Sequence, residues 1–203
     1  MALPLFDGFE DGDLSEYTQV QSRESDTWDI QVNTDQPYEG SYSAYCPANS
    51  AGSGAGSIEV RYLDTHDVVE YTSKFYIDHN DAYIEFNIFT HENSNGAEVG
   101  YGYMGEDNNS IQRWTNNTSR TYLQSLFLSE HTWYELYVKV DRTADEVYIE
   151  IRDPSDGSVI ESATDTNPDI GSQQLAGIGM NHGDQDGDGY MDNLTGEIPG
   201  LAL

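Results

Sequence analysis

A series of alternating aspartates near the C-terminus has the spacing of an acidic calcium-binding loop. The segment Asp184-Gln-Asp-Gly-Asp-Gly-Tyr-Met-Asp192 places carboxylates at loop positions 1, 3, 5 and 9 and a glycine at the sharp turn of position 6. Ca²⁺ takes about six to eight oxygen ligands, and the bound ion cancels the repulsion between clustered carboxylates. The sequence therefore predicts a structural calcium ion whose ligands are Asp184, Asp186, Asp188, the carbonyl of Tyr190 and Asp192.

The end of this loop departs from the helix-loop-helix calcium pattern. Thr195 stands where a bidentate glutamate is usual, and no helix signal follows it. Glu197, or Glu10 from the opening strand, would have to complete the ligand shell. An acidic turn that holds only salt and water is the alternative, because aspartate is abundant throughout the chain.

Sequence motifs that would indicate a catalytic site are weak in this chain. Retaining glycoside hydrolysis needs two carboxyl groups about 5–5.5 Å apart. Glu146 and Glu150 would share one strand face, but they would lie about 13 Å apart along it. The chain has no Gly-x-Ser-x-Gly nucleophile turn, and its 5 histidines show no zinc-binding spacing. We therefore expect no enzymatic activity.

Aromatic residues are the candidates for sugar contacts, because sugar sites combine ring platforms with polar groups that pair with hydroxyls. The chain has 15 tyrosines. Several aromatic residues fall on strand faces that alternate away from the expected core, or lie beside loops, and the selected candidates are Tyr83, Tyr137, Tyr148, Tyr101 and Trp114. The alternative is that these rings pack beneath loops or within a subunit interface.

Short segments with a two-residue rhythm must position these groups. Every second residue is apolar in 133–141 and in 146–153, which predicts half-buried antiparallel strands. Turn residues at 141–145 and 153–157 join such strands as hairpins. Similar short segments recur from residue 5 to residue 194, and one short helical turn is expected at Asp11–Tyr17. The pattern predicts an all-β, two-sheet antiparallel jelly-roll sandwich, with residues 1–203 as a single domain.

The charge balance is strongly acidic, with 37 Asp and Glu against 8 Lys and Arg and a formal net charge of −29. Nucleic acid and membranes are excluded as partners, because there is no basic cluster and no apolar stretch near the roughly 20 residues of a membrane helix. The carboxylates are spread along the whole chain, as on an acidic surface. At about 1 M salt the Debye length falls to ~3 Å and screens most of their repulsion, so we expect a halophilic source.

Four segments follow one another in the order of a known family. They are Phe9-Glu-Asp-Gly-Asp-Leu-Ser-Glu-Tyr17, Tyr38-Glu-Gly-Ser-Tyr-Ser-Ala-Tyr45, Thr132-Trp-Tyr-Glu-Leu-Tyr-Val-Lys-Val-Asp141 and Gly189-Tyr-Met-Asp-Asn-Leu194. This set resembles concanavalin A-like lectin/glucanase (LamG-like) domains of a haloarchaeal or haloarchaeal-virus type. The resemblance implies a jelly roll with a concave face that often binds carbohydrate in the family. It also implies a structural calcium where the opening and closing strands meet, which would bring Glu10 near Asp192.

Three functions fit these features, and the fold alone does not choose between them. The first is a non-catalytic virion surface protein of a halophilic virus, such as a head turret, decoration or tail-fibre domain. It would form a homo-oligomer, contact other virion proteins and bind a host-surface glycan or glycoprotein. No secretory signal is expected, since the first basic residue is Arg23 and Asp7 interrupts the opening apolar residues, and virion assembly offers an exit without one.

The second hypothesis is a carbohydrate-binding module or lectin of a cellular organism, which would use the same aromatic candidates. The third is a glycoside hydrolase, which the missing pair of carboxylates argues against.

Overall fold

The computed structural model describes residues 5–15, 19–22, 30–46, 56–79, 83–90, 99–105, 109–115, 119–168, 175–183 and 189–197. Within these ranges all regular secondary structure is β-strand, and no helix is long and apolar enough to cross a membrane. The strands are β1 (Leu5–Asp7), β2 (Gln19–Ser22), β3 (Gln31–Asn33), β4 (Ser43–Cys46), β5 (Gly56–His66), β6 (Val68–Ile77), β7 (Tyr83–Thr90), β8 (Val99–Met104), β9 (Ser110–Thr115), β10 (Ser119–Ser125), β11 (Thr132–Asp141), β12 (Glu146–Arg152), β13 (Val159–Asp165), β14 (Leu175–Gly183) and β15 (Gly189–Glu197).

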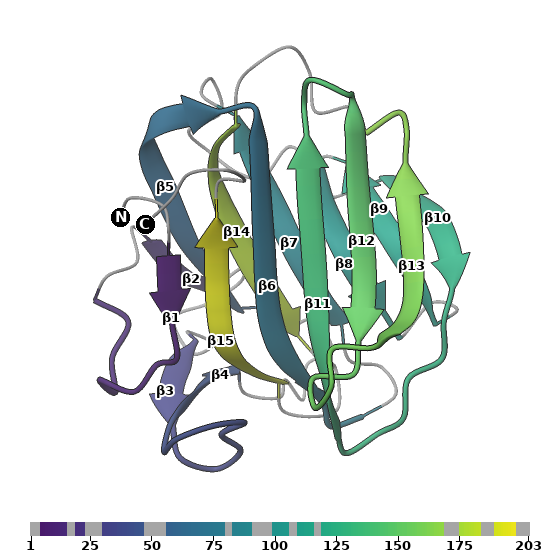
Figure 1. The fold of residues 1–203 in the computed structure, drawn as a ribbon. Coiled ribbons are helices and arrows are strands. Elements are labelled where there is room, and N and C mark those ends of the chain that lie inside the picture. Colours follow the sequence, from purple (N-terminus) through teal and green to yellow (C-terminus); the bar gives the residue numbers. More distant parts are fainter. Residues whose placement is uncertain are drawn as a thin grey trace.

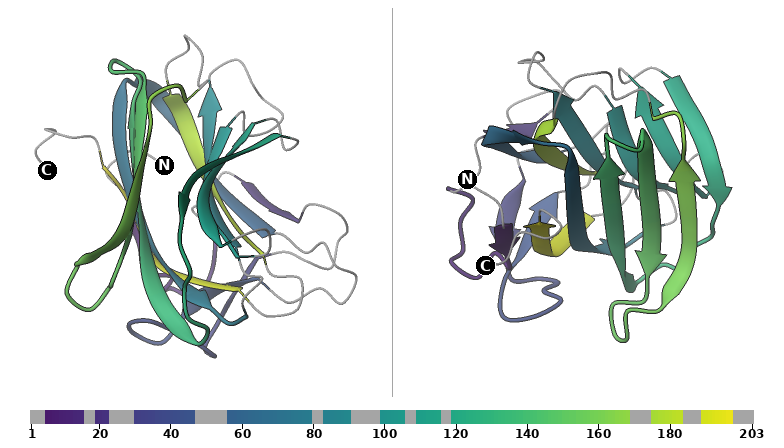
Figure 2. Two further views of the ribbon diagram at one scale, coloured as in Figure 1. Left: turned by 90° about the vertical axis from the view of Figure 1, so that its right-hand side faces the viewer. Right: turned by 45° about the horizontal axis from the view of Figure 1, so that its top comes forward.

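Two antiparallel sheets pack face to face (Figure 1). Sheet A has the strand order β13-β12-β11-β6-β15-β4-β3, and β1 also pairs with β15. Sheet B has the order β10-β9-β8-β7-β14-β5-β2. The left-hand view of Figure 2 shows sheet B curving toward sheet A at its middle, so that the outer face of sheet B is the hollowed one. The all-β, two-sheet jelly roll predicted from the sequence is confirmed.

The two-residue rhythm of the sequence places one face of each strand in the core between the sheets. On β11 the buried residues alternate with half-buried ones, and β12 follows the same pattern except that Glu150 on its outer face is also buried, as predicted in outline for 133–141 and 146–153. Sheet B contributes to this core the alternate residues Val99, Tyr101 and Tyr103 of β8 and Ile111 of β9. The largest fully buried side chains include Tyr71, Phe75, Tyr101, Tyr103 and Ile111.

Both predicted hairpin turns are present in sheet A. Asp141 pairs with Glu146, and the carboxylate of Asp141 accepts the backbone N–H of Ala144 at 2.8 Å. At the next turn the N–H of Gly157 donates to the carbonyl of Asp153 at 2.8 Å, and Gly157 has a φ of 73°. A left-handed φ costs glycine nothing, which is why this residue suits the position.

Two local predictions differ from the structure. The strand β2 was not expected, because its residues Gln-Val-Gln-Ser include a single apolar side chain. The expected helical turn at Asp11–Tyr17 is not a helix over its described part, 11–15. There the carboxylate of Asp13 accepts the N–H of Ser15 at 2.8 Å, a local bond that competes with helix formation.

Candidate functional site

The outer face of sheet B offers a candidate site where β8, β9 and β10 lie side by side. Ile111 is fully buried in the core, so its neighbours Ser110 and Gln112 lie on the opposite, outer face of β9. Across the ladder, Gly102 of β8 pairs with Gln112, and Tyr122 of β10 pairs with the same residue from the other side. Because glycine has no side chain, the outer surface formed by Gly102, Gln112 and Tyr122 is recessed at β8.

A hollow of about 620 Å³ lies along the β9–β10 edge of the sheet. Polar groups dominate its lining, which consists of Ser110, Tyr122, Leu123, Gln124 and Ser125. The ring of Tyr122 is 53% exposed, and Leu123 packs inward against the core. An exposed ring beside hydroxyl and amide groups is the combination that sugar-binding sites use.

Gln112, which pairs with Tyr122 across the ladder, has an unsatisfied acceptor. Its side chain is fully buried, and its amide nitrogen donates to the hydroxyl of Ser110 at 2.9 Å. Its amide oxygen has no hydrogen-bond partner in the described part of the chain. A buried acceptor without a partner costs about 1–3 kcal/mol of stability.

One of the five predicted sugar-binding residues lies on this face beside the hollow. Trp114 is two residues from Gln112 on β9 and is 6% exposed, so its ring is mostly covered. Tyr83 pairs with Met104 at the start of β7, but its side chain lies outside what the structure describes. Tyr122 was not selected from the sequence. The signal that could have found it is its position on a strand whose side chains are nearly all exposed.

Tyr101 lies in the core and not at the surface. Its side chain is fully buried, and its hydroxyl donates toward the carboxylate of Asp165 at 3.0 Å and lies 3.2 Å from the carbonyl of Pro168. Arg113 pairs with the same carboxylate at 2.8 Å. Burial, followed by the charge of Asp165, raises the pKa of the Tyr101 hydroxyl. This buried contact joins β8 and β9 of sheet B to β13 of sheet A, so Tyr101 stabilises the sandwich.

The two remaining tyrosines lie on the outer face of sheet A, away from the hollow. The rings of Tyr137 and Tyr148 meet edge to face with centroids 6.3 Å apart. The guanidinium of Arg152 lies 4.0 Å above the Tyr137 ring, and the Tyr148 hydroxyl donates to Glu150 at 2.5 Å. Burial, followed by the nearby Glu70, raises the pKa of Tyr137 to about 12. Both rings are therefore part of a charged network within the protein.

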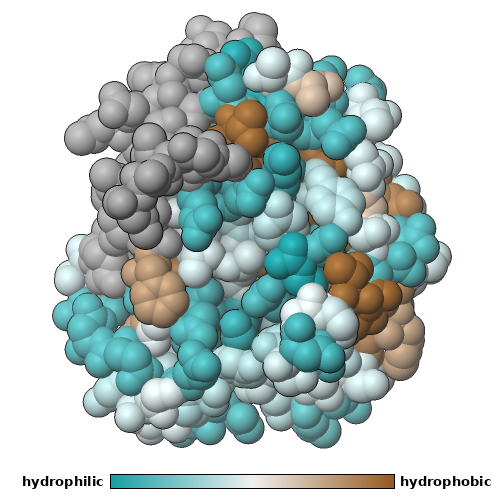
Figure 3. Space-filling view, viewed as in Figure 1, coloured by the Kyte–Doolittle hydropathy of each residue, from teal (hydrophilic) through white to brown (hydrophobic). Residues whose placement is uncertain are grey.

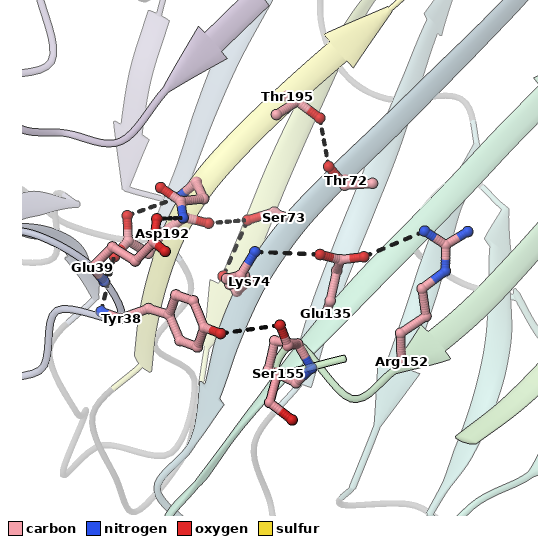
Figure 4. Close-up of polar contacts among 12 residues, drawn as sticks. Tyr38, Glu39, Thr72, Ser73, Lys74, Glu135, Arg152, Ser155, Asp192 and Thr195 are labelled. Atoms are coloured by element: carbon pink, nitrogen blue, oxygen red, sulfur yellow. Dashed lines mark hydrogen bonds and ion pairs between the residues drawn. The ribbon is translucent and has the colours of Figure 1, made fainter. Parts of the chain in front are cut away.

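That network extends across sheet A (Figure 4). Glu135 accepts from Lys74 at 3.3 Å and from Arg152 at 3.3 Å. Lys74 lies 4.8 Å from the centre of the Tyr38 ring, and the Tyr38 hydroxyl donates to the carbonyl of Pro154 at 3.1 Å. Figure 3 shows this face as mostly hydrophilic, with one hydrophobic cluster at its right-hand edge and separate hydrophobic residues elsewhere. The charged groups of this face satisfy one another.

The predicted calcium ligands fall into two groups. Asp184, Asp186 and Asp188 lie outside the described residues. Tyr190 and Asp192 are buried in β15, and the Tyr190 ring packs against Tyr45 and Tyr76 at 5.3 and 5.9 Å between centroids. Among the residues that are described, no group of three or more His, Cys, Asp or Glu side chains is placed to hold a metal ion.

Asp192 and Glu10 bind the same turn, residues 38–42. One carboxylate oxygen of Asp192 accepts the N–H groups of Tyr38 and Glu39 at 2.8 and 3.0 Å. The carboxylate of Glu10 accepts the N–H groups of Ser41 and Tyr42, each at 3.0 Å. Burial raises the pKa of Asp192, the backbone N–H groups oppose that shift, and the charge of Glu10 adds to it. The opening and closing strands thus bring these two carboxylates to one turn, as the resemblance implied.

Gly40 makes this arrangement possible. Its φ is +67°, and a Cβ at this position would overlap the carboxylate of Glu10. The turn therefore needs glycine both for its backbone conformation and for the space that the carboxylate fills.

No protein-family model matches the sequence, and no curated protein matches it. Solved structures do match. A sialidase has a TM-score of 0.61 at 11% identity, over 97% of this chain and 18% of the sialidase chain. The cellulose-induced protein Cip1 has a TM-score of 0.65 at 13% identity, over 95% of this chain and 96% of Cip1. The CBM22-2 xylan-binding domain of Paenibacillus barcinonensis Xyn10C has a TM-score of 0.53 at 11% identity, over 95% and 98%.

At these identities the likeness shows the fold alone. This chain spans less than a fifth of the sialidase, with 18% covered, but nearly all of Cip1 and of the xylan-binding domain. The chain therefore shares the two-sheet jelly-roll fold of these structures, in agreement with the concanavalin A-like fold class predicted from the sequence.

Proposed function

We propose that this chain is a non-catalytic module that binds carbohydrate on the outer face of sheet B. The observation that carries the proposal is the hollow beside Tyr122, where a half-exposed ring stands next to the hydroxyl and amide groups of Ser110, Gln124 and Ser125. Support also comes from the fold, since one of the similar structures is a xylan-binding domain. Fold likeness does not establish a ligand, so the site geometry is the stronger support.

A glycan array in concentrated salt, followed by calorimetry with the best ligand, tests the proposal. Replacing Tyr122 by alanine removes the ring platform and should weaken binding about tenfold, or ~1.4 kcal/mol. Phe127→Ala is the matched control, because this ring is 69% exposed on the same segment but does not line the hollow. Absence of binding to every glycan would end the proposal. Equal losses of glycan affinity in the two variants would mean that Tyr122 is not part of the binding site.

We further propose that calcium stabilises the meeting point of the opening and closing strands. Glu10 and Asp192 already converge on the 38–42 turn, and a cation would offset the cost of burying Asp192 in its charged form. A calcium titration should raise the melting temperature, and chelator should reverse the rise. Asp186→Asn and Asp188→Asn should reduce that rise if the acidic loop supplies ligands. An unchanged melting temperature at millimolar calcium would reject the site.

The setting that we propose is the surface of a halophilic virus particle, where the module would act in host adhesion. Its support is the net charge of −29, which favours concentrated salt. A cellular carbohydrate-binding module fits the same fold and the same site. Mass spectrometry of purified virus particles decides between the two settings: presence among the particle proteins supports the first, and presence only in cell or secreted fractions supports the second.

The same proposal includes self-association. Val159 and Ile160 are exposed large hydrophobic side chains on the edge strand β13. A second copy carries the same −29 charge, so it can approach most closely at uncharged residues such as these. Light scattering should give twice the chain mass of 22.7 kDa in concentrated salt, and Ile160→Asp should restore the monomer. A monomeric wild type at high protein concentration would exclude the homo-oligomer.

A further inference from the structure

The cations of this chain are few, and most of them are paired within the protein. The sequence has 8 Lys and Arg against 37 Asp and Glu. The side chains of Arg23 and Arg61 lie outside what the structure describes. Five of the other cations form ion pairs, which are Lys74 with Glu135, Lys139 with Glu70, Arg113 with Asp165, Arg142 with Asp67 and Arg152 with Glu135. The charge of these five side chains is therefore used within the fold.

The two arginines that lie nearest the hollow in the sequence are also occupied. Arg113 points toward the core side of β9 and donates to the carboxylate of Asp165 at 2.8 Å and to the hydroxyl of Thr121 at 3.3 Å. Arg120 of β10 also interacts within the protein. Neither arginine is among the described residues that line the hollow. A negatively charged ligand group would therefore meet no guanidinium in that lining.

The described lining of the hollow is polar but uncharged. It consists of Ser110, Tyr122, Leu123, Gln124 and Ser125. Ser125 pairs with Ser110 across the ladder, so two hydroxyl groups stand on neighbouring strands. A hydroxyl both donates and accepts hydrogen bonds, and the amide group of glutamine also offers both. Sugar hydroxyls have the same double capacity, so this lining matches an uncharged sugar.

A charged ligand group would lose hydration in the hollow without gaining a partner of opposite charge. A carboxylate only accepts hydrogen bonds and an ammonium group only donates them. Removing either ion from water is costly unless an opposite charge replaces the water. The cross-strand row that contains Tyr122 runs through Gln112 and Gly102 to Glu85 on β7, so the charged residue at the other end of this row is acidic. The row is therefore unsuited to an anion.

Concentrated salt leaves the choice of ligand to the groups in direct contact with it. At about 1 M salt the Debye length is ~3 Å. The net charge of −29 then neither repels an anionic polymer nor attracts a cationic one from a distance. What remains is the lining itself, which offers a ring, hydroxyl groups and an amide.

We propose that the uncharged lining of this hollow selects a neutral glycan, with a sugar ring stacked on Tyr122 and its hydroxyl groups paired with Ser110, Gln124 and Ser125. The inference rests on the proposed function and adds the class of ligand to it. Uronate, sulfated and amino sugars are the classes that the lining rejects.

A glycan array that contains matched pairs, read in about 2 M KCl, tests this inference. The pairs are dextran with dextran sulfate, methyl-esterified with free polygalacturonate, and chitin oligomers with their deacetylated forms. In each pair that the wild type recognises, the neutral member should bind about tenfold more tightly, and calorimetry would measure this preference. If the tightest ligand belongs to no pair, its own charge decides, because a charged ligand overturns the inference and a neutral one agrees with it.

Two variants locate the cause of the preference. Gln124→Arg places a cation in the lining, so the sulfated or uronate polymer gains a partner and the preference should fall to within about twofold. Thr164→Arg is the matched control. Thr164 is exposed on β13 and pairs with Tyr148 on the outer face of sheet A, so this variant adds the same charge on the opposite face. It should leave the preference unchanged.

The outcomes separate this inference from the proposed function. A charged polymer that binds as tightly as its neutral counterpart overturns the neutral ligand and leaves carbohydrate binding in place. An equal change of preference in Gln124→Arg and Thr164→Arg, or no change in either, overturns selection by the lining. Failure of the wild type to bind any glycan overturns the proposed function and this inference with it.

Discussion

The outer faces of the two sheets differ in how their polar groups are satisfied. On sheet A, Lys74 and Arg152 both pair with Glu135, and the Tyr137 ring lies under Arg152. On sheet B, the amide oxygen of Gln112 is buried without a partner in the described residues. Ser43 of sheet A also has a buried hydroxyl without a partner in these residues, so the contrast between the faces lies in the charged groups, which pair on sheet A.

The comparison teaches that aromatic residues on a strand face do not by themselves mark a sugar site. Both faces carry tyrosines, but Tyr137 and Tyr148 already contact charged groups of the protein. Tyr122 lies beside a hollow lined by hydroxyl and amide groups. We therefore expect changes on sheet A to alter stability, and changes around Tyr122 to alter binding.

The largest effect should come from Asp192 on sheet A. Asp192→Ala leaves the N–H groups of Tyr38, Glu39 and Asn193 without their acceptor, and we expect a loss of about 3 kcal/mol in the free energy of unfolding. Asp192→Asn keeps one acceptor oxygen and should cost about 1 kcal/mol. Denaturant unfolding in concentrated salt measures both values.

Glu197→Ala provides the control for these two variants. Glu197 is exposed at the end of the same strand, so its removal should change the free energy of unfolding by less than about 0.5 kcal/mol. Similar losses for Glu197→Ala and Asp192→Ala would mean that Asp192 does not hold the 38–42 turn.

Arg152→Ala should have the next largest effect. This change removes the cation between Glu135 and Glu150 and uncovers the ring of Tyr137, so we expect a loss of about 2 kcal/mol. Lys139→Ala removes a more exposed cation, 3.8 Å from Glu70, and should cost less than about 0.5 kcal/mol. Thermal and denaturant unfolding measure the two variants. If Arg152→Ala instead abolished glycan binding at unchanged stability, sheet A would be the binding face.

An alkaline titration sharpens the comparison further. Tyr137 has a pKa raised from 10.0 to about 12, so the folded state keeps its proton after the unfolded chain has lost it. The contribution of Tyr137 to stability is therefore present below pH 10.0 and is lost as the pH rises toward about 12. The difference in ultraviolet absorbance between wild type and Tyr137→Phe reports its ionisation. Ionisation of Tyr137 near its ordinary pKa would show that the network does not cover the ring.

The smallest effect should be that of Tyr148→Ala on glycan affinity. The sequence placed Tyr148 among the sugar contacts, but its hydroxyl donates to Glu150 on the face opposite the hollow. We expect the affinity to stay within about twofold of the wild type, while Tyr122→Ala weakens it about tenfold. A loss of affinity in Tyr148→Ala that matches Tyr122→Ala would place the ligand on sheet A.

Prediction from the sequence succeeded where a pattern is local. The alternation of Leu136, Val138 and Val140 predicted the core face of β11, because successive side chains on a strand point to opposite sides. The turns at 141–145 and 153–157 followed from their residue types.

Prediction failed where the environment of a residue is set by distant parts of the chain. Tyr101 and Tyr122 are both tyrosines on strands of sheet B, but one is fully buried and the other is 53% exposed. Periodicity shows which residues share a face and not what covers that face. Tyr101 is covered because β13, far along the chain, brings Asp165 to its hydroxyl.

By itself, the sequence determined the strand pattern, the acidic surface and the absence of acidic residues between 108 and 129, because each of these is a property of neighbouring residues or of composition. Only the tertiary structure decided that Asp192 binds a turn 154 residues away and that Tyr122 borders a hollow. The physical reason is that strand pairing brings together residues from distant parts of the chain, and their packing fixes which polar groups are satisfied and which remain available to a ligand.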